Sequence, residues 1–179
     1  MLSIFNGIGH YMIIRPERPE DINAIHRVTT QAFGRPQEAD LIDALRANKH
    51  VTLSLVAIYH NEVVGHILFF PLEVKSEHGA HAAIGLGPMA VLPQYQKQGI
   101  GSALVSEGLN ILQQRSHSGV IVLGHAAFYP RFGFVPASAY KIKTEYDVPD
   151  EVFMAYELHP GALAEISGTV IYSAEFDSV

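Results

Sequence analysis

The stretch that decides the fold runs Met89-Ala90-Val91-Leu92-Pro93-Gln94-Tyr95-Gln96-Lys97-Gln98-Gly99-Ile100-Gly101. A strand ends near Pro93, a tight turn follows, and a helix begins at the two glycines. The first N–H groups of a helix have no partner within the helix, and in such a turn they point at one place. The helix dipole adds partial positive charge there, so the turn predicts a site for a phosphate or pyrophosphate.

Two features of the turn strengthen that prediction. Gly99 and Gly101 have no Cβ and let the backbone come close to an anion, and Lys97 adds one formal positive charge. The same pattern also fits an ordinary corner between a strand and a helix that binds nothing. The residues by themselves leave both interpretations open.

Other site motifs are missing or incomplete. No Gly-Lys-Ser/Thr ends a Walker loop, and the letters G-x-G-x-x-A from Gly85 to Ala90 continue as a strand instead of opening a helix. His78 and His81 form H-x-x-H in a polar loop without partners at metal spacing, so we expect no metal. The chain has no Cys, which excludes disulfides and a cysteine nucleophile, and it has no nucleophile-elbow sequence.

The segments on either side of this stretch predict alternating helices and strands. Apolar residues at helical spacing predict helices over 21–33, 37–47 and 99–114, and a short one over 126–132. Apolar runs predict strands over 12–15, 53–59, 63–74, 82–91, 120–123, 134–135, 153–158 and 169–172. Residues 76–81 are expected to form a polar loop, and residues 140–150 a lid or an exposed loop. This order predicts one α+β or α/β domain built on a mixed sheet.

Three motifs in register resemble the GNAT (GCN5-related) N-acetyltransferase superfamily. Gln96-Lys97-Gln98-Gly99-Ile100-Gly101 fits its Q/R-x-x-G-x-G/A motif, Val91-x-Pro93 precedes it, and Tyr129-x-x-x-Gly133-Phe134 follows. The start Ile14-Arg15-Pro16, followed by Asp21-Ile22, is also similar. The likeness covers Met12 to about Leu158 and is nearest in character to YhbS-like bacterial acetyltransferases. It implies a mostly antiparallel central sheet with helices on both faces and a bulged, splayed strand at Gly85–Pro88.

The resemblance also implies which residues act. Met89, Ala90 and Val91 would meet the pantetheine arm of acetyl-CoA as an added strand does, and an N–H near Met89 or Ala90 would hold the oxyanion. Tyr129 is the candidate general acid beside the leaving sulfur, or alternatively one more aromatic residue in a cluster. Residues 123–128, just before it, form a shorter segment than in many family members. The pyrophosphate would be held by the turn and the first helical residues: Gln96, Lys97, Gln98, Gly99, Ile100, Gly101 and Ser102.

The expected function is therefore acetyl-CoA-dependent transfer of an acetyl group to a primary amine of a small molecule or peptide. With no Cys to carry the acetyl group, direct attack within a ternary complex is expected. A non-catalytic acyl-CoA-binding module, or one linked to a carrier protein, is the alternative. The general base is left open among a water chain and four side chains, Glu38, His66, Glu73 and His125.

Composition sets the remaining expectations. The 179 residues carry a net charge of −6 and a pI of about 5.9, which argues against nucleic acid or anionic membranes as partners and leans towards cationic amines. No apolar run is long enough to span a bilayer, and we expect a cytoplasmic protein. Residues 1–11 are expected to be a loose extension before a single domain over 12–179, with its core at about 12–158. A homodimer is left open.

Overall fold

The computed structural model describes residues 3–7, 10–77 and 79–178. The contacts divide the chain into two compact units. The first unit comprises the described residues up to Phe69, then Gly87–Gly108 and the end from Glu175; the second comprises Phe70–Leu86 and Leu109–Ala174. The chain passes from one unit to the other within strands β4 (Glu62–Ser76) and β5 (Gly79–Val91), helix α3 (Ile100–Gln114) and the 3-10 helix η6 (Ala174–Ser178).

The strands of the first unit form an antiparallel succession. Strand β1 (Ser3–Gly7) pairs with β2 (His10–Pro16), β2 pairs with β3 (Leu53–Tyr59), and β3 pairs with β4. The turn between β3 and β4 has positive φ at His60 and Asn61, as expected for a tight hairpin. Residues 1–11 were expected to be loose, yet residues 3–7 are hydrogen-bonded to β2 in register Ser3↔Ile14.

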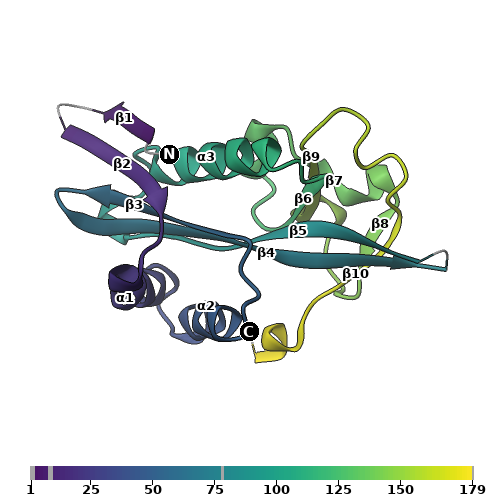
Figure 1. The fold of residues 1–179 in the computed structure, drawn as a ribbon, viewed down its shortest axis with the longest axis horizontal. Coiled ribbons are helices and arrows are strands. Elements are labelled where there is room, and N and C mark those ends of the chain that lie inside the picture. Colours follow the sequence, from purple (N-terminus) through teal and green to yellow (C-terminus); the bar gives the residue numbers. More distant parts are fainter. Residues whose placement is uncertain (1–2, 8–9, 78, 179) are drawn as a thin grey trace. The chain divides into compact units, whose positions relative to one another are not determined.

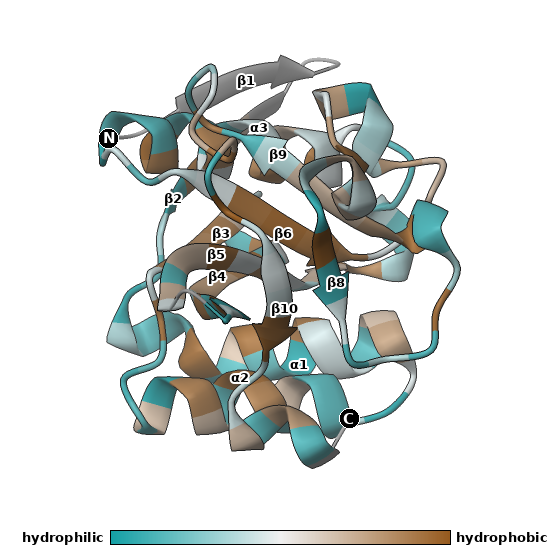
Figure 2. Ribbon diagram, turned by 90° about the vertical axis from the view of Figure 1, so that its right-hand side faces the viewer, coloured by the Kyte–Doolittle hydropathy of each residue, from teal (hydrophilic) through white to brown (hydrophobic). Residues whose placement is uncertain are grey.

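Helices lie on both sides of these strands. Figure 1 shows α1 (Ile22–Phe33) and α2 (Gln37–Ala47) on one side of β3 and β4, and the first turns of α3 on the other. Figure 2 shows hydrophobic and hydrophilic residues interleaved along α1 and α2, the pattern of helices with one buried face. The 3-10 helix η1 (Pro19–Asp21) precedes α1, and Gly34 ends α1 in the left-handed conformation.

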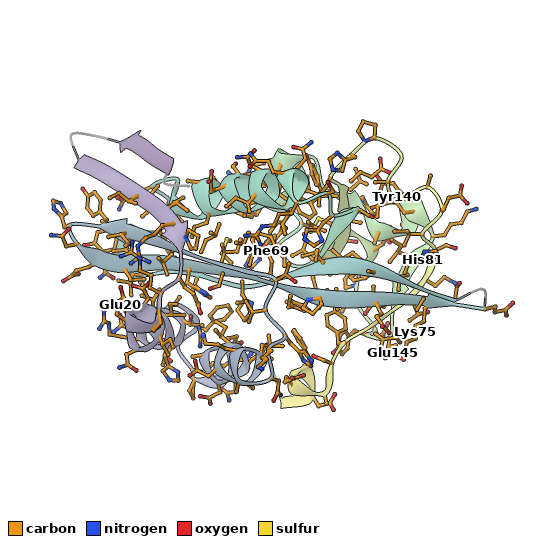
Figure 3. All side chains as sticks on the ribbon, viewed as in Figure 1. Glu20, Phe69, Lys75, His81, Tyr140 and Glu145 are labelled. Carbon is orange, nitrogen blue, oxygen red and sulfur yellow. The ribbon has the colours of Figure 1, made fainter. Side chains whose placement is uncertain are left out.

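Two glycines bring α3 close to β4. A Cβ on Gly108 would lie 2.3 Å from the ring of Phe69, and one on Gly65 would lie 3.1 Å from Ile100. Phe69 is fully buried, and Figure 3 shows it in the interior along β4. Because α3 begins at the predicted anion-binding turn, this packing also positions that turn on the unit's core.

The second unit combines antiparallel and parallel pairs. Strand β5 follows β4 and pairs in parallel with β6 (Gly119–Leu123) at Ile84 and Gly85. Strand β6 then pairs antiparallel with β9 (Phe153–Glu157), and β9 pairs antiparallel with β7 (Val135–Pro136). Strand β10 (Gly168–Ile171) lies antiparallel to the end of β4 and parallel to β8 (Ile142–Thr144). Short 3-10 helices connect them: η3 (Tyr129–Phe132), η4 (Ala137–Tyr140) and η5 (Asp150–Val152).

The elements confirm the predicted fold class and most of the predicted boundaries. Residues 76–81 were expected to be a loop, but β4 continues to Ser76 and β5 starts at Gly79. The polar segment 140–150 was expected to be a lid or exposed loop, and it contains β8. Over the ranges described, no helix combines the length and apolar character needed to cross a membrane.

Candidate active site

The turn between β5 and α3 has a defined backbone geometry. The 3-10 helix η2 (Pro93–Tyr95) follows β5, and the Leu92 N–H donates to the Val64 carbonyl at 2.9 Å, which ties the end of β5 to β4. Lys97 (φ 59°) and Gly99 (φ 88°) both adopt the left-handed conformation. Residues 96–99 are exposed, so the turn is open to a ligand.

Two glutamine side chains brace the turn from within. Gln96 Nε2 donates to the Val91 carbonyl at 3.0 Å, and Gln98 Nε2 donates to the Gln94 carbonyl at 3.0 Å. Both residues were predicted to bind the cofactor as part of the turn, through its backbone amides. The structure shows them holding the loop in shape, which leaves the backbone N–H groups as the donors for an anion.

The start of α3 supplies those donors. The Ala103 N–H donates to the Gly99 carbonyl at 2.9 Å, the first hydrogen bond of the helix. The amides of Ile100, Gly101 and Ser102 precede it and belong to the first turn, where N–H groups have no helical acceptor. Together with the helix dipole and the exposed Lys97, they suit a phosphate or pyrophosphate.

The predicted pantetheine strand lies at the end of β5. Ala90 is buried, while Met89 and Val91 are half-buried. The Val91 carbonyl oxygen accepts one hydrogen bond from Gln96. Because a carbonyl oxygen has two lone pairs, it can accept a second hydrogen bond. These residues and the turn belong to the first unit.

Tyr129 belongs to the second unit, and its ring packs closely among other aromatic side chains. Its ring makes edge contacts with Phe128, at 5.1 Å between centroids, and Phe134, at 5.5 Å. A Cβ on Gly124 would lie 2.4 Å from Tyr129 Cε2, so only glycine leaves room for the ring. Burial raises the pKa of Tyr129 to about 12, so the phenol keeps its proton at neutral pH.

The hydroxyl of Tyr129 differs from its ring in one respect. The residue is only 6% exposed, yet its oxygen has no hydrogen-bond partner among the described residues and is not one of the fully enclosed polar atoms. The hydroxyl is therefore not held by any other described side chain or backbone group. This is the property required of a hydrogen-bond donor or general acid.

The four candidate bases occupy very different surroundings. Glu73 is exposed with its carboxylate 3.6 Å from the Lys75 ammonium, and His125 is exposed. Glu38 is buried and accepts from the Arg35 guanidinium, with one contact at 2.9 Å from Nε. His66 is fully buried, and burial lowers its pKa. Being enclosed by the protein, His66 cannot take a proton from a bound amine directly.

His66 belongs to a partly buried polar network that the sequence did not predict. Ser54 Oγ lies 2.8 Å from His66 Nε2 and donates to Glu17, whose carboxylate also accepts from Arg46 Nε at 2.8 Å and from a second guanidinium nitrogen at 3.0 Å. A neutral His66 with its proton on Nε2 satisfies this chain. Burial alone would raise the pKa of Glu17, but the neighbouring His66, with its Nε2 3.7 Å from the carboxylate, and hydrogen bonds from Arg46 and Ser54 outweigh it and hold that pKa far below its usual range.

No metal centre is formed by the part of the chain that the structure describes. The described residues contain no group of three or more His, Asp or Glu side chains placed to hold an ion. Of the H-x-x-H pair in the sequence, His78 lies outside the described residues. The candidate residues are therefore the backbone amides of the turn in the first unit and, separately, the buried Tyr129 of the second unit.

Comparisons with known proteins identify the family to which the chain belongs. Residues 13–137 match the model of the acetyltransferase (GNAT) domain family. The chain is 37% identical to YjhQ of Escherichia coli, described as an N-acetyltransferase, over 79% of this chain and 80% of that protein. One similar solved structure is E. coli YhbS, a GNAT family N-acetyltransferase, in complex with CoA; the sequence identity is 30%, the TM-score is 0.89, and the match covers 97% of this chain and 96% of that one. Another is a GNAT family acetyltransferase from Brucella melitensis in complex with acetyl-CoA; the identity is 37%, the TM-score is 0.78, and the match covers 94% of this chain and 99% of that one. The chain thus belongs to the GNAT family of acetyltransferases.

Proposed function

We propose that this acetyltransferase takes its acetyl group from acetyl-CoA and passes it directly to a primary amine within a ternary complex. The observation that carries the proposal is the exposed turn of residues 96–99, braced by its own glutamines and leading into the free amides of α3. The relatives from E. coli and Brucella melitensis, solved with CoA and acetyl-CoA, support the choice of ligand.

In the bound complex, each part of the first unit has a distinct role. Amides from Gln96 to Ser102 hold the pyrophosphate, and Lys97 adds charge beside it. The backbone of Met89, Ala90 and Val91 pairs with the pantetheine arm as a strand would. An N–H of Met89 or Ala90 stabilises the negative charge that develops on the carbonyl oxygen.

The reaction then needs no covalent enzyme intermediate. The neutral amine nitrogen attacks the thioester carbon, a C–N bond forms, the tetrahedral intermediate collapses, and the C–S bond breaks to release CoA thiolate. The amine loses its proton to water or to a base. The chain has no Cys to accept the acetyl group, which supports direct transfer.

Tyr129 acts on the leaving sulfur through its hydroxyl proton. Its pKa of about 12 lies well above the value of about 8.5 that is usual for a thiol, so complete proton transfer from phenol to thiolate is uphill. We therefore assign Tyr129 a hydrogen bond to the developing thiolate, which stabilises the charge as the C–S bond breaks, with solvent completing the protonation. Charge-assisted hydrogen bonds of this kind are short and strong.

Calorimetry and a thiol-release assay test the proposal. Acetyl-CoA should bind, and a screen of small amines and peptides should reveal an acceptor that releases CoA thiol. Tyr129→Phe should leave the Kd for acetyl-CoA within about twofold and lower turnover by about 10²-fold. Tyr140→Phe, which removes another hydroxyl of the same unit, is the matched control and should leave both quantities unchanged.

Three outcomes would contradict parts of this proposal. No binding of acetyl-CoA up to high micromolar concentration would remove the function altogether. Binding without thiol release for any amine would favour a non-catalytic acyl-CoA-binding module. Turnover of Tyr129→Phe equal to that of Tyr140→Phe would take Tyr129 out of the chemistry.

A further inference from the structure

The second unit contains an open hollow in which positive charge is concentrated. Its volume is about 890 Å³, at the upper end of the usual range for small-molecule sites. Three lysines line it, Lys75, Lys141 and Lys143. The whole chain has only five lysines, the other two being Lys49 and Lys97, so most of them gather in one place in a protein whose net charge is −6.

Strand register explains why the lysines meet there. Thr169 of β10 pairs with Lys75 of β4 on one side and with Lys143 of β8 on the other. Paired residues of neighbouring strands point to the same face of a sheet, and strands lie about 4.8 Å apart, which puts the Cα atoms of Lys75 and Lys143 roughly 10 Å from each other. Val74 and Val170, one residue along, are buried, so the lysines point away from the core.

A glycine keeps these three strands together. Gly168 has a φ of 138° and lies so close to β4 that a Cβ would come 2.1 Å from the Lys75 carbonyl oxygen. Its N–H donates to the Lys141 carbonyl at 3.2 Å. The lysines are therefore carried by paired strands and a hydrogen-bonded turn, and Figure 3 shows Lys75 near the end of the long β4 strand.

The positive charge in the hollow is largely unbalanced. Lys75 has one exposed contact, 3.6 Å from Glu73, and pairs of this kind contribute little. Within the ranges the structure describes, neither Lys141 nor Lys143 has a carboxylate within 4 Å, and the one acidic residue of the lining is Glu77. Lys75 and Lys143 carry like charges on the two strands that flank β10, and like charges repel one another. An anionic ligand would remove that repulsion.

Hydroxyl groups in the lining add neutral donors to the lysine charges. Ser167 and Thr169 line the hollow, and among the described residues their hydroxyls have no hydrogen-bond partner. Two other serines of the lining are already engaged: Ser138 Oγ donates to Asp150 at 2.9 Å and Ser76 Oγ to the Gly79 carbonyl at 3.3 Å. Ammonium and hydroxyl donors around one hollow are the groups that bind phosphate and carboxylate oxygens.

We propose that this hollow, which we call the lysine hollow, binds a small ligand that carries two or more phosphate or carboxylate groups. The spacing of Lys75 and Lys143 suits a ligand with separated charges better than a single ion. None of its lining residues belongs to the turn at Gln96–Gly99, so it is a second anion site, independent of the proposed acetyl-CoA site.

Lysine-selective NMR of the full chain tests this proposal residue by residue. Five lysines give five side-chain signals, each assigned by its Lys→Gln variant. Titration with inorganic tripolyphosphate, and separately with a tricarboxylate, should shift the signals of Lys75, Lys141 and Lys143 in a saturable manner. The comparison of the two probes shows which oxyanion is preferred. The Lys49 signal should not shift. A shift of the Lys97 signal would indicate binding at the turn proposed for acetyl-CoA and not in the lysine hollow.

Variants complete the test. The double change Lys141→Gln and Lys143→Gln should weaken the response of Lys75 by about tenfold, whereas Lys143→Arg keeps the charge and should retain it. Lys49→Gln removes one charge elsewhere and should leave the titration unchanged. The proposal is overturned if the three signals move no more than Lys49 up to 10 mM probe, or if the double variant responds as the wild type does.

Discussion

Replacing Gly99 by Ala tests whether the turn before α3 must hold its left-handed conformation to bind acetyl-CoA. Gly99 has a φ of 88°, and no atom lies within 4 Å of the position that a Cβ would take, so the substitution causes backbone strain and no clash. For an L-residue that conformation costs about 1–2 kcal/mol. In the free variant, the turn can relax to negative φ. Binding must then restore the original shape, and the Kd for acetyl-CoA should rise by about 5- to 30-fold.

Calorimetry of acetyl-CoA binding measures the effect, and Gly34→Ala is its matched control. Gly34 ends α1 in the same unit, has a φ of 73°, and likewise has open space where a Cβ would be. Gly34→Ala should lower the free energy of unfolding by a similar 1–2 kcal/mol and leave the Kd unchanged. A Gly99→Ala protein that binds acetyl-CoA within twofold of wild type would refute the role of the turn, as would an equal loss of affinity in Gly34→Ala.

Further predictions concern the polar network around His66 and the packing of Gly124 against the Tyr129 ring. Glu17→Gln removes the charge that faces Arg46 and should lower the free energy of unfolding by about 2–3 kcal/mol in urea titrations. The folded-state pKa values of Glu17 and His66 are both lowered, so the folded state binds fewer protons than the unfolded chain and stability should decrease as the pH falls. His66 should contribute the decrease below pH 6.5 and Glu17 the further decrease below pH 4.5. Glu17→Gln should therefore lose the decrease below pH 4.5. Gly124→Ala forces the ring of Tyr129 to move and should lower turnover more than it raises the Kd for acetyl-CoA; equal effects on both would contradict the proposed position of the hydroxyl.

The parts of the fold that the sequence predicts best are those decided by neighbouring residues. The helix over Gln37–Ala47 matches its predicted bounds, and α3 starts within one residue of its prediction because Pro93 and the glycines end one element and begin the next. The turn of the candidate site, residues 96–99, is predictable for the same reason. Its residues lie within one short stretch, so the sequence alone shows their spacing and backbone freedom.

Features assembled from distant segments were not predictable. The network of Glu17, Ser54 and His66 joins residues from two strands and the end of a third, and nothing in the order of residues shows that their side chains share one interior space. His66 was read as a candidate base, and only its full burial shows that it cannot meet a substrate. The lysine hollow depends in the same way on strand register, since Lys75 and Lys143 are neighbours only through β10.

The acidic composition of the chain is compatible with the two proposed anion sites because formal charge and local potential differ. A net charge of −6 sets the field at long range, which is screened beyond about 8 Å at physiological salt. The turn before α3 offers peptide amides, which do not count in the formal charge at all, and the lysine hollow gathers three of the five lysines from β4, β8 and the residue before β8. A compact anion needs only a few donors within hydrogen-bonding distance. What this chain can bind is therefore decided by where its few positive groups lie and less by how many it has.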